Sequence, residues 1–344
     1  MRSIDWNDES NSIVLIDQTK LPKDRVMLEC RGVDALAEAI RSLRVRGAPA
    51  LGVAGGLGVA LAAQISKARG PRDLIQDMEG AAQILRNTRP TAINLSWGID
   101  RVLSKAKVGR SVARIRELAL GEAKKMADED VQKCKQIGEH GASLLEDGDV
   151  VLTHCNAGRM GCVDWGTALG IVRSAIEEGK RIKVIACETR PLNQGSRITT
   201  WELLQDDIPV TLITDSTIGH VMNSGMVDKV IVGADRIVED AVFNKIGTYT
   251  LSIVAKKHGI PFYVAAPLAS FDFDRRASDI EIEERSPSEL KYFGDEQIAP
   301  LEVKVYNPAF DATPMENISA IITEHGILYP PFSFEEIKQR YQGR

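Results

Sequence analysis

The sequence predicts an α/β protein in which a small helical amino-terminal domain is followed by a Rossmann-like carboxyl-terminal domain with a parallel sheet. Three observations predict this class. The amino-terminal third has apolar residues at helical spacing, the remaining two thirds alternate short apolar runs with helical patterns, and polar residues follow the apolar runs. We place the two domains at residues 1–127 and 128–344.

Helical patterns begin the chain. Residues 33–45 repeat apolar side chains at helical spacing, and the run 50–63 consists almost entirely of Gly, Ala, Leu and Val, which indicates a tightly packed, buried helix. Pro49 stands where that second helix begins, so its first N–H groups are available to an anion. The segment Arg46-Gly-Ala-Pro49 fits a plain turn between helices equally well.

Two further helices are predicted over residues 71–86 and 112–145. In the segment between them, Pro90 disfavours helix at the residue before it. Arg89 is therefore presented from irregular chain. A loop arginine is ordinarily solvated, but this one becomes a candidate ligand if a phosphate has to be held.

The rest of the chain alternates strands and helices. Strand-like runs are predicted over residues 150–153, 181–187, 210–214, 229–233 and 262–265. Helix-like runs lie between them, over residues 167–178, 199–205, 218–226 and 250–258. This order predicts right-handed crossovers and a parallel sheet with helices on both faces.

Two of the strand-like runs end in side chains that can do chemistry. Cys155 follows the run 150–153, and Asp235 follows the run 229–233. Ligands of open parallel sheets bind at the carboxyl ends of strands, so these two residues are expected to share one cleft. Asp235 alone also fits a helix cap or an ion pair with Arg236. The other four cysteines are expected to be small buried apolar residues; they are Cys30, Cys134, Cys162 and Cys187.

Composition excludes several classes. The net charge of -5 provides no basic field for a nucleic-acid backbone. No apolar run reaches the ~20 residues of a membrane span, and the first residues lack the core of a signal peptide. Five cysteines without a CxxC pair indicate reduced thiols in a cytoplasm. The cysteines and histidines have no zinc-ligand spacing, so no metal site is expected.

Eight short motifs follow one another in the order of a known family. They are Arg46-Gly-Ala-Pro-Ala50, Arg89-Pro-Thr-Ala92, Thr153-His-Cys-Asn-Ala-Gly158, Gly166-Thr-Ala-Leu-Gly170, Glu188-Thr-Arg-Pro191, Gly233-Ala-Asp-Arg-Ile237, Asn244-Lys-Ile-Gly-Thr-Tyr249 and Asn307-Pro-Ala-Phe-Asp311. With them the chain resembles the methylthioribose-1-phosphate isomerases, within the wider family that includes the regulatory subunits of the translation-initiation guanine-nucleotide exchange factor.

The resemblance implies a homodimeric aldose–ketose isomerase that needs no metal or organic cofactor and converts a 5-substituted ribose 1-phosphate into the ribulose 1-phosphate. It implies that Cys155 and Asp235 are the catalytic pair. The substrate contacts that it implies are Arg46, Gly47, Ala48, Arg89, Gln194, Asn244 and Lys245.

The implied chemistry needs a positioned acid, because phosphate on the anomeric oxygen prevents spontaneous ring opening. Asp235, kept protonated by an apolar site, is expected to donate to the ring oxygen. Cys155 then removes the C2 proton as a thiolate or stabilises charge during a hydride transfer, and the sequence does not separate these routes.

Two segments depart from the family pattern: Arg159-Met-Gly-Cys-Val-Asp-Trp165 and Glu239-Asp-Ala-Val-Phe243. Met160 and Trp165 fit an apolar pocket for a methylthio or methyl group, as in 5-deoxyribose 1-phosphate, whereas Arg159 fits the second phosphate of ribose 1,5-bisphosphate. Ordinary packing explains all three equally. The other class that stays open is a non-catalytic subunit that senses a sugar phosphate or nucleotide.

Overall fold

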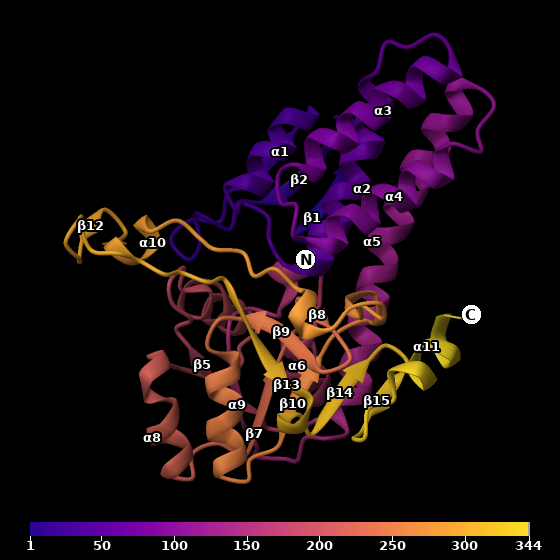
Figure 1. Ribbon diagram of the computed structural model, residues 1–344. Helices are drawn as coiled ribbons and strands as arrows, with labels where there is room; N and C mark the ends of the chain where they lie inside the picture. Colours follow the sequence, from indigo (N-terminus) through magenta and orange to yellow (C-terminus); the bar gives the residue numbers. More distant parts are fainter. Residues whose placement is uncertain (343–344) are drawn as a thin grey trace. The chain divides into compact units, whose positions relative to one another are not determined.

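The computed structural model describes residues 1–342, and its contacts divide the chain into two compact units (Figure 1). Unit 1 consists of Met1–Lys135 and Ala157–Gly170. Unit 2 consists of Gln136–Asn156 and the chain from Ile171 onward. The chain thus crosses between the units more than once. The predicted domain ranges, 1–127 and 128–344, remain a prediction.

Unit 2 is built on a seven-stranded sheet. Its strands, in spatial order, are β15 (Gly326–Leu328), β14 (Ala320–Thr323), β10 (Phe262–Ala265), β7 (Lys229–Val232), β4 (Val150–Thr153), β5 (Lys183–Cys187) and β6 (Val210–Ile213). All neighbours pair in parallel except the edge pair of β14 and β15. The predicted α/β class with a parallel sheet is confirmed, and the five predicted strands are present. The strands β14 and β15 were not predicted.

Helices cover this sheet where the sequence places them. The predicted crossover helices are α6 (Ala168–Glu177), α7 (Thr200–Gln205), α8 (Ile218–Asn223) and α9 (Thr248–Lys257). Val221 and Met222 of α8 and Leu251 of α9 are buried in one core with the strand residues Val230 and Val264. Strands buried in this way need continuous apolar runs, which explains why their positions were predictable.

Smaller elements complete unit 2. A three-stranded antiparallel sheet has the order β13 (Phe310–Pro314), β9 (Ala241–Lys245), β8 (Arg236–Ile237), and β11 (Tyr292–Phe293) pairs with β12 (Glu296–Gln297). Short helix α10 (Ser288–Lys291) precedes β11, and α11 (Phe334–Gln342) follows β15. The antiparallel sheet matters for function because β9 carries two of the predicted substrate residues.

Unit 1 contains helices and a small antiparallel sheet. The sheet has the order β1 (Ile4–Asn7), β2 (Ser12–Ile16), β3 (Met27–Cys30). The helices are α1 (Val33–Arg41), α2 (Ala48–Ile65), α3 (Pro71–Arg86), α4 (Ile93–Ala106) and the first part of α5 (Val112–Ala142). The helices predicted over 33–45, 50–63, 71–86 and 112–145 are confirmed, with small shifts at their ends. The sheet and α4 were not predicted.

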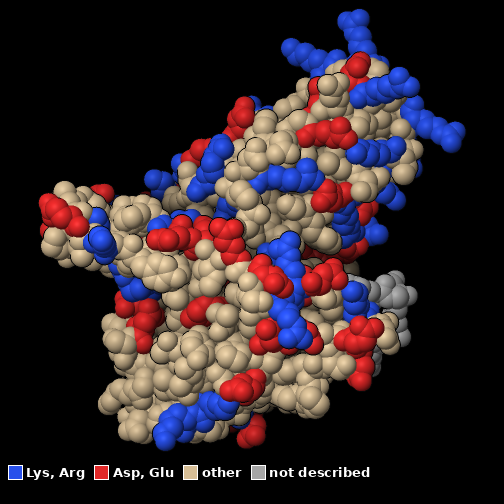
Figure 2. All heavy atoms as spheres, viewed as in Figure 1, with Lys and Arg blue, Asp and Glu red and all other residues tan. Residues whose placement is uncertain are grey.

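The charged side chains are interspersed on the surface. On the face drawn in Figure 2, acidic and basic groups alternate over both units, and the described residues of that face form no continuous basic band. A nucleic-acid backbone is held by clustered Lys and Arg side chains. The charge on this face is thus mixed in sign.

Helix α2 forms the centre of unit 1. It is long and apolar enough to cross a membrane by length and composition, but 78% of it is buried in the protein, as in the core helix of a globular fold. Its glycines let α4 approach closely: a Cβ added at Gly98 of α4 would lie 1.9 Å from the carbonyl oxygen of Gly52 in α2. The two helices thus touch through their backbones, and the absent side chains are what permits it.

We expect Gly98→Ala to lower the free energy of unfolding by about 1–3 kcal/mol, because a methyl group forces the α2 and α4 backbones apart. Gly80→Ala in α3 is the matched control. Its added Cβ meets nothing within 4 Å, so it is expected to stabilise by roughly 0.5–1 kcal/mol through helix propensity. Urea unfolding of both variants measures this. Equal effects of the two substitutions would contradict the backbone contact.

Candidate active site

The strand order of unit 2 reverses between β4 and β7. From β4 the chain builds β5 and β6 on one side, and it then returns to place β7 on the other side of β4. At such a switch point the connecting loops part, and ligands of open parallel sheets bind there. Cys155 follows β4 and Asp235 follows β7. The two residues predicted to carry the chemistry therefore lie at neighbouring strand ends.

A side-chain hydrogen bond joins these two strand ends. Thr153, the last residue of β4, donates from Oγ1 to the carbonyl oxygen of Ile231 in β7 at 2.8 Å. The threonine is 3% exposed, so the bond is protected from water. It fixes the starting points of the Cys155 and Asp235 loops relative to each other.

Cys155 has an unusual backbone conformation. Its φ is 63°, in the left-handed region that costs a non-glycine residue of the order of 1–3 kcal/mol. Two threonines hold it there: the Cys155 N–H donates to Thr189 Oγ1 at 2.8 Å, and the Cys155 carbonyl accepts from Thr199 Oγ1 at 2.6 Å. The thiol is half-buried. The loop thus presents a cysteine whose backbone is fixed on both sides.

A buried polar network supports Thr199. The Asn156 Nδ2 atom donates to Thr199 Oγ1 at 3.2 Å and to Glu202 Oε1 at 2.9 Å. Glu202 is fully buried, and its other oxygen accepts from Arg173 Nη2 at 2.9 Å. Sequence analysis missed Thr199, Glu202 and Arg173. The available sequence signal was Glu202, an acidic residue beside apolar residues in the predicted helix, and such a residue only weakly indicates a buried polar network.

Asp215, which follows β6, organises the neighbouring loop. Its carboxylate accepts the N–H groups of Thr189 at 2.8 Å and Arg190 at 2.7 Å. His154 lies beside it, with Nδ1 at 3.9 Å from Asp215 Oδ1 and Nε2 at 2.8 Å from the Ile246 carbonyl. A carbonyl only accepts, so Nε2 carries the ring proton. Burial lowers the pKa of His154, which favours the neutral ring.

The same corner offers one set of metal-ligating atoms. One ligand atom from each of His154, Cys187 and Asp215 lies within 4.8 Å of the others. His154 already donates from Nε2 to the Ile246 carbonyl at 2.8 Å. Asp215 already accepts two backbone N–H groups, as described above. The closeness of these three residues is therefore explained by their role in positioning the Cys155 loop, and we assign no metal to them.

Asp235 lies in the bend between β7 and β8. Its backbone N–H donates to the carbonyl of Phe243 in β9 at 2.9 Å, and its side chain is half-buried. Arg236 forms an ion pair with Asp272, with Nη1 and Oδ2 separated by 3.7 Å. Pairing of β8 with β9 thus sets the direction of the Asp235 backbone.

Three predicted substrate residues are buried polar groups of unit 2. Asn244 of β9 donates from Nδ2 to Thr248 Oγ1 at 3.1 Å. Lys245 donates from Nζ to the Ala309 carbonyl at 2.8 Å. Gln194 is 5% exposed, and its Oε1 atom has no hydrogen-bond partner among the described residues. Burying such an acceptor without a partner is costly, which makes Gln194 suited to a ligand that donates.

The remaining predicted substrate residues belong to unit 1. Arg46 is almost buried directly ahead of α2, and Gly47 has a φ of 97°. A Cβ at Gly47 would lie 2.3 Å from the carbonyl oxygen of Gly161, so this position requires glycine. Ala48 begins α2. Each of these residues thus has its place fixed at the amino terminus of a helix.

Arg89 lies in irregular chain between α3 and α4, as predicted from Pro90. The first turns of α2 and α4 are neighbours, since a Cβ on Gly52 would lie 3.1 Å from the Asn94 carbonyl. Arg46 and Arg89 therefore precede the amino termini of two packed helices. This is a favourable electrostatic setting for an anion.

The segment that departs from the family pattern is packed within unit 1. Arg159 Nε donates to Asp164 Oδ1 at 3.3 Å, and Met160 is fully buried. The Lys135 ammonium lies 5.4 Å from the centroid of the Trp165 ring. Their roles towards a 5-substituent or a second phosphate remain predictions.

Comparison with known proteins places the chain in a family. Residues 44–330 match the Initiation factor 2 subunit family, and the chain belongs to it. It is 61% identical over 337 residues to the putative methylthioribose-1-phosphate isomerase of Methanosarcina acetivorans, covering 98% of this chain and 97% of the relative. It is 48% identical over 333 residues to the 5-deoxyribose 1-phosphate isomerase of Moorella thermoacetica, covering 96% of this chain and 94% of the relative.

Two solved structures share the fold. The 5-methylthioribose 1-phosphate isomerase of Pyrococcus horikoshii aligns with a TM-score of 0.92 at 42% identity, over 100% of this chain and 96% of the other. A protein of A. fulgidus described as the delta subunit of translation initiation factor eIF-2B aligns with a TM-score of 0.89 at 61% identity, over 98% of both chains. Similar proteins thus carry both isomerase and initiation-factor names.

We expect Arg173→Met to lower the free energy of unfolding by about 3–5 kcal/mol, because it leaves the Glu202 carboxylate buried without its cation. Arg181→Met is the matched control: Arg181 pairs with Asp147 at 2.6 Å, but both side chains are exposed. The control is expected to change stability far less. Chemical denaturation compares the two, and a similar loss in both would contradict the role of burial.

Proposed function

We propose that this chain is an aldose–ketose isomerase that acts on a ribose 1-phosphate ester, converting 5-methylthioribose 1-phosphate into 5-methylthioribulose 1-phosphate in methionine salvage. The observation that carries the proposal is the position of Cys155 and Asp235 at the adjacent ends of β4 and β7. Relatives with isomerase names, aligned over nearly the whole chain, support it.

The first step is ring opening. The anomeric oxygen carries phosphate, so the sugar cannot open as a free hemiacetal does, and an acid has to assist. The Asp235 carboxyl donates its proton to the ring oxygen while the bond between that oxygen and C1 breaks. The position of Asp235 after β7, at the switch point of the sheet, supports this role.

The second step moves hydrogen from C2 to C1. In one route the Cys155 thiolate removes the C2 proton and returns it to C1; in the other a hydride passes directly from C2 to C1 beside Cys155. In both routes the proton of the C2 hydroxyl returns to the Asp235 carboxylate, which restores the acid. Incorporation of solvent deuterium at C1 distinguishes the proton route from the hydride route.

Gln194, Asn244 and Lys245 are proposed to bind the substrate in unit 2. The Lys245 ammonium supplies positive charge for the phosphate, and the Gln194 carbonyl oxygen can accept from a sugar hydroxyl. In unit 1, Arg46 and Arg89 are proposed as phosphate ligands, with Gly47 and Ala48 offering backbone N–H groups at the start of α2.

Three alternatives rest on specific observations. The relative from Moorella thermoacetica favours 5-deoxyribose 1-phosphate, and Arg159 favours ribose 1,5-bisphosphate. The A. fulgidus structure favours a non-catalytic regulatory subunit. Cys155 and Asp235 together favour an enzyme, since a sensing subunit has no use for an acid and a thiol at one switch point. The homodimer remains an expectation from the family resemblance, and the cytoplasmic location remains an expectation from the cysteine content.

An isomerase assay with the three esters side by side tests the proposal. We expect the purified protein to prefer the methylthio ester, and Asp235→Asn to lower kcat by on the order of 10²-fold or more while substrate still binds. Cys155→Ser is expected to lose turnover as well. Preference for another ester reassigns the substrate and keeps the chemistry. Near-native turnover in Asp235→Asn removes that residue from the mechanism, and absence of turnover on every ester favours the regulatory subunit.

Arg89→Ala is expected to weaken binding of both the substrate and inorganic phosphate, because a charged donor to the phosphate is lost. Calorimetric titration of each ligand measures this. Arg110→Ala, which removes an arginine from the loop that precedes α5, is the control for net charge. Loss of affinity for the ester with unchanged affinity for phosphate would show that Arg89 does not bind the phosphate.

A further inference from the structure

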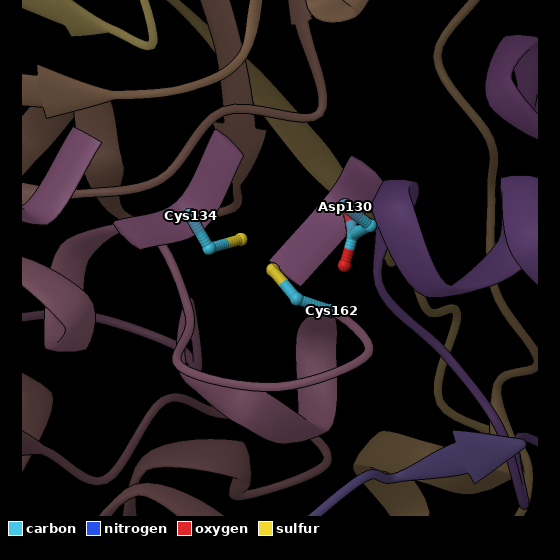
Figure 3. Close-up of side chains that lie close together, drawn as sticks. All are labelled: Asp130, Cys134 and Cys162. Carbon is cyan, nitrogen blue, oxygen red and sulfur yellow. The ribbon is translucent and has the colours of Figure 1, made fainter. Parts of the chain in front are cut away.

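Three side chains of unit 1 converge outside the proposed active site (Figure 3). Asp130 and Cys134 lie one turn apart on α5, so both point to the same side of the helix. Cys162 comes from the segment just after the short helix Arg159–Gly161. One ligand atom of each residue lies within 4.8 Å of the others, and Figure 3 shows the two sulfur atoms facing each other beside the carboxylate.

A backbone amide supports the carboxylate. The Val163 N–H donates to Asp130 Oδ2 at 2.7 Å. Such donors stabilise the anionic form of the atom that they meet, and they recur around metal-bound thiolates and carboxylates.

The amino terminus anchors the segment that carries Cys162. Ser3 donates from Oγ to the Cys162 carbonyl at 2.5 Å and from its N–H to the Val163 carbonyl at 2.7 Å. Ser3 is 2% exposed, so these bonds are buried. The position of Cys162 is therefore fixed by backbone contacts and does not depend on a cation.

We propose that Asp130, Cys134 and Cys162 form a binding site for a thiophilic divalent cation, with Zn²⁺ as the reference ion. Two thiolates and a carboxylate are ligands that Zn²⁺ accepts, and three protein ligands leave a fourth tetrahedral position for water or another group. When deprotonated, two thiolates and a carboxylate carry three negative charges, which a divalent cation would largely offset.

A cation bound by the carboxylate and the two sulfurs would compensate their buried charge. It also ties α5 to the segment after Arg159–Gly161, which would stabilise the folded state of unit 1 by mass action.

Spacing along the chain does not reveal this site. Cys134 and Cys162 are far apart in sequence and belong to no CxxC pair, so no zinc site was expected. The helical spacing of Asp130 and Cys134 is common to any helix. Only the packing of the segment after Arg159–Gly161 against α5 brings the two sulfurs together.

Cobalt(II) tests the proposal on the full-length protein. The purified, reduced protein is stripped with a chelator and titrated with Co²⁺ without oxygen. We expect one Co²⁺ per chain and a thiolate-to-cobalt charge-transfer band in the near ultraviolet, displaced by Zn²⁺. Zn²⁺ is also expected to raise the Tm of the stripped protein.

Matched variants locate the ion. Cys134→Ser and Cys162→Ser are expected to abolish the band and the Tm increase, whereas Cys30→Ser, which removes another buried thiol of unit 1, leaves both unchanged. Asp130→Asn is expected to keep the band, because both thiolates remain. It is expected to weaken Zn²⁺ binding by more than roughly 100-fold, since loss of an outer-shell partner alone costs roughly 10–100-fold and Asp130 is proposed as a direct ligand. Circular dichroism checks that each variant is folded. If a serine variant does not fold, Cys162→Ala is measured in its place, with the same expected loss of the band and of the Tm increase.

Two outcomes overturn the proposal. They are the absence of a band in the fully reduced parent protein and a band that persists unchanged in Cys134→Ser. The test is independent of the isomerase assay, because its readouts are absorbance and Tm. Failure of the cation site therefore leaves the proposed function unaffected, and the reverse also holds.

Discussion

The pairing of β4 with β7 is the constraint on which the candidate site depends. Only two register pairs and the Thr153 side chain join these strands, yet the pairing lies at the middle of the sheet, where the strand order reverses. Strands on either side continue the same parallel pattern. Cys155 and Asp235 come from distant parts of the chain, so their proximity follows from this pairing and from no local preference.

The buried polar network converts that rough proximity into a fixed geometry. A buried ion pair such as Arg173 with Glu202 pays a large desolvation cost and is tolerated only when its hydrogen bonds are complete. Asn156 and Thr199 complete them and end at the Cys155 carbonyl. Because this network has few other ways to complete its hydrogen bonds, it holds Cys155 in the left-handed conformation. The contacts use the backbone of Cys155, so the thiol stays available for chemistry.

Most of the sheet could be predicted because buried parallel strands are continuous apolar runs with a chemical residue directly after them. The strands β1 to β3 escaped prediction because they are short and lie before the first helix, where no turn motif was recognised. Helix α4 was missed although Leu95, Ile99 and Val102 repeat at helical spacing on its buried face. Asn94 and Gly98 lie on the same face. Those residues suit backbone contact with α2, which is a property of the pair and not of α4 alone.

The candidate site shows the same division. Cys155, Asp235 and the exposed end of the sheet were predictable from strand order, and the motifs pointed to Asn244, Lys245 and Gln194. The supporting contacts of Thr189, Thr199 and Glu202 were not, because each joins segments that only the folded chain brings together. A sequence can reveal a reactive residue type, but the orientation of that residue depends on these contacts.

One such contact decides which group of unit 2 can meet a phosphate. The amino terminus of α9 follows Lys245 and would ordinarily attract an anion, but the Gly247 and Tyr249 N–H groups donate to the Asp311 carboxylate at 2.7 and 3.1 Å. That terminus already holds a negative group. The Lys245 ammonium is buried against the Ala309 carbonyl and the Phe310 ring. Our proposal for phosphate binding in unit 2 therefore uses the positive charge of the Lys245 side chain and not the α9 dipole.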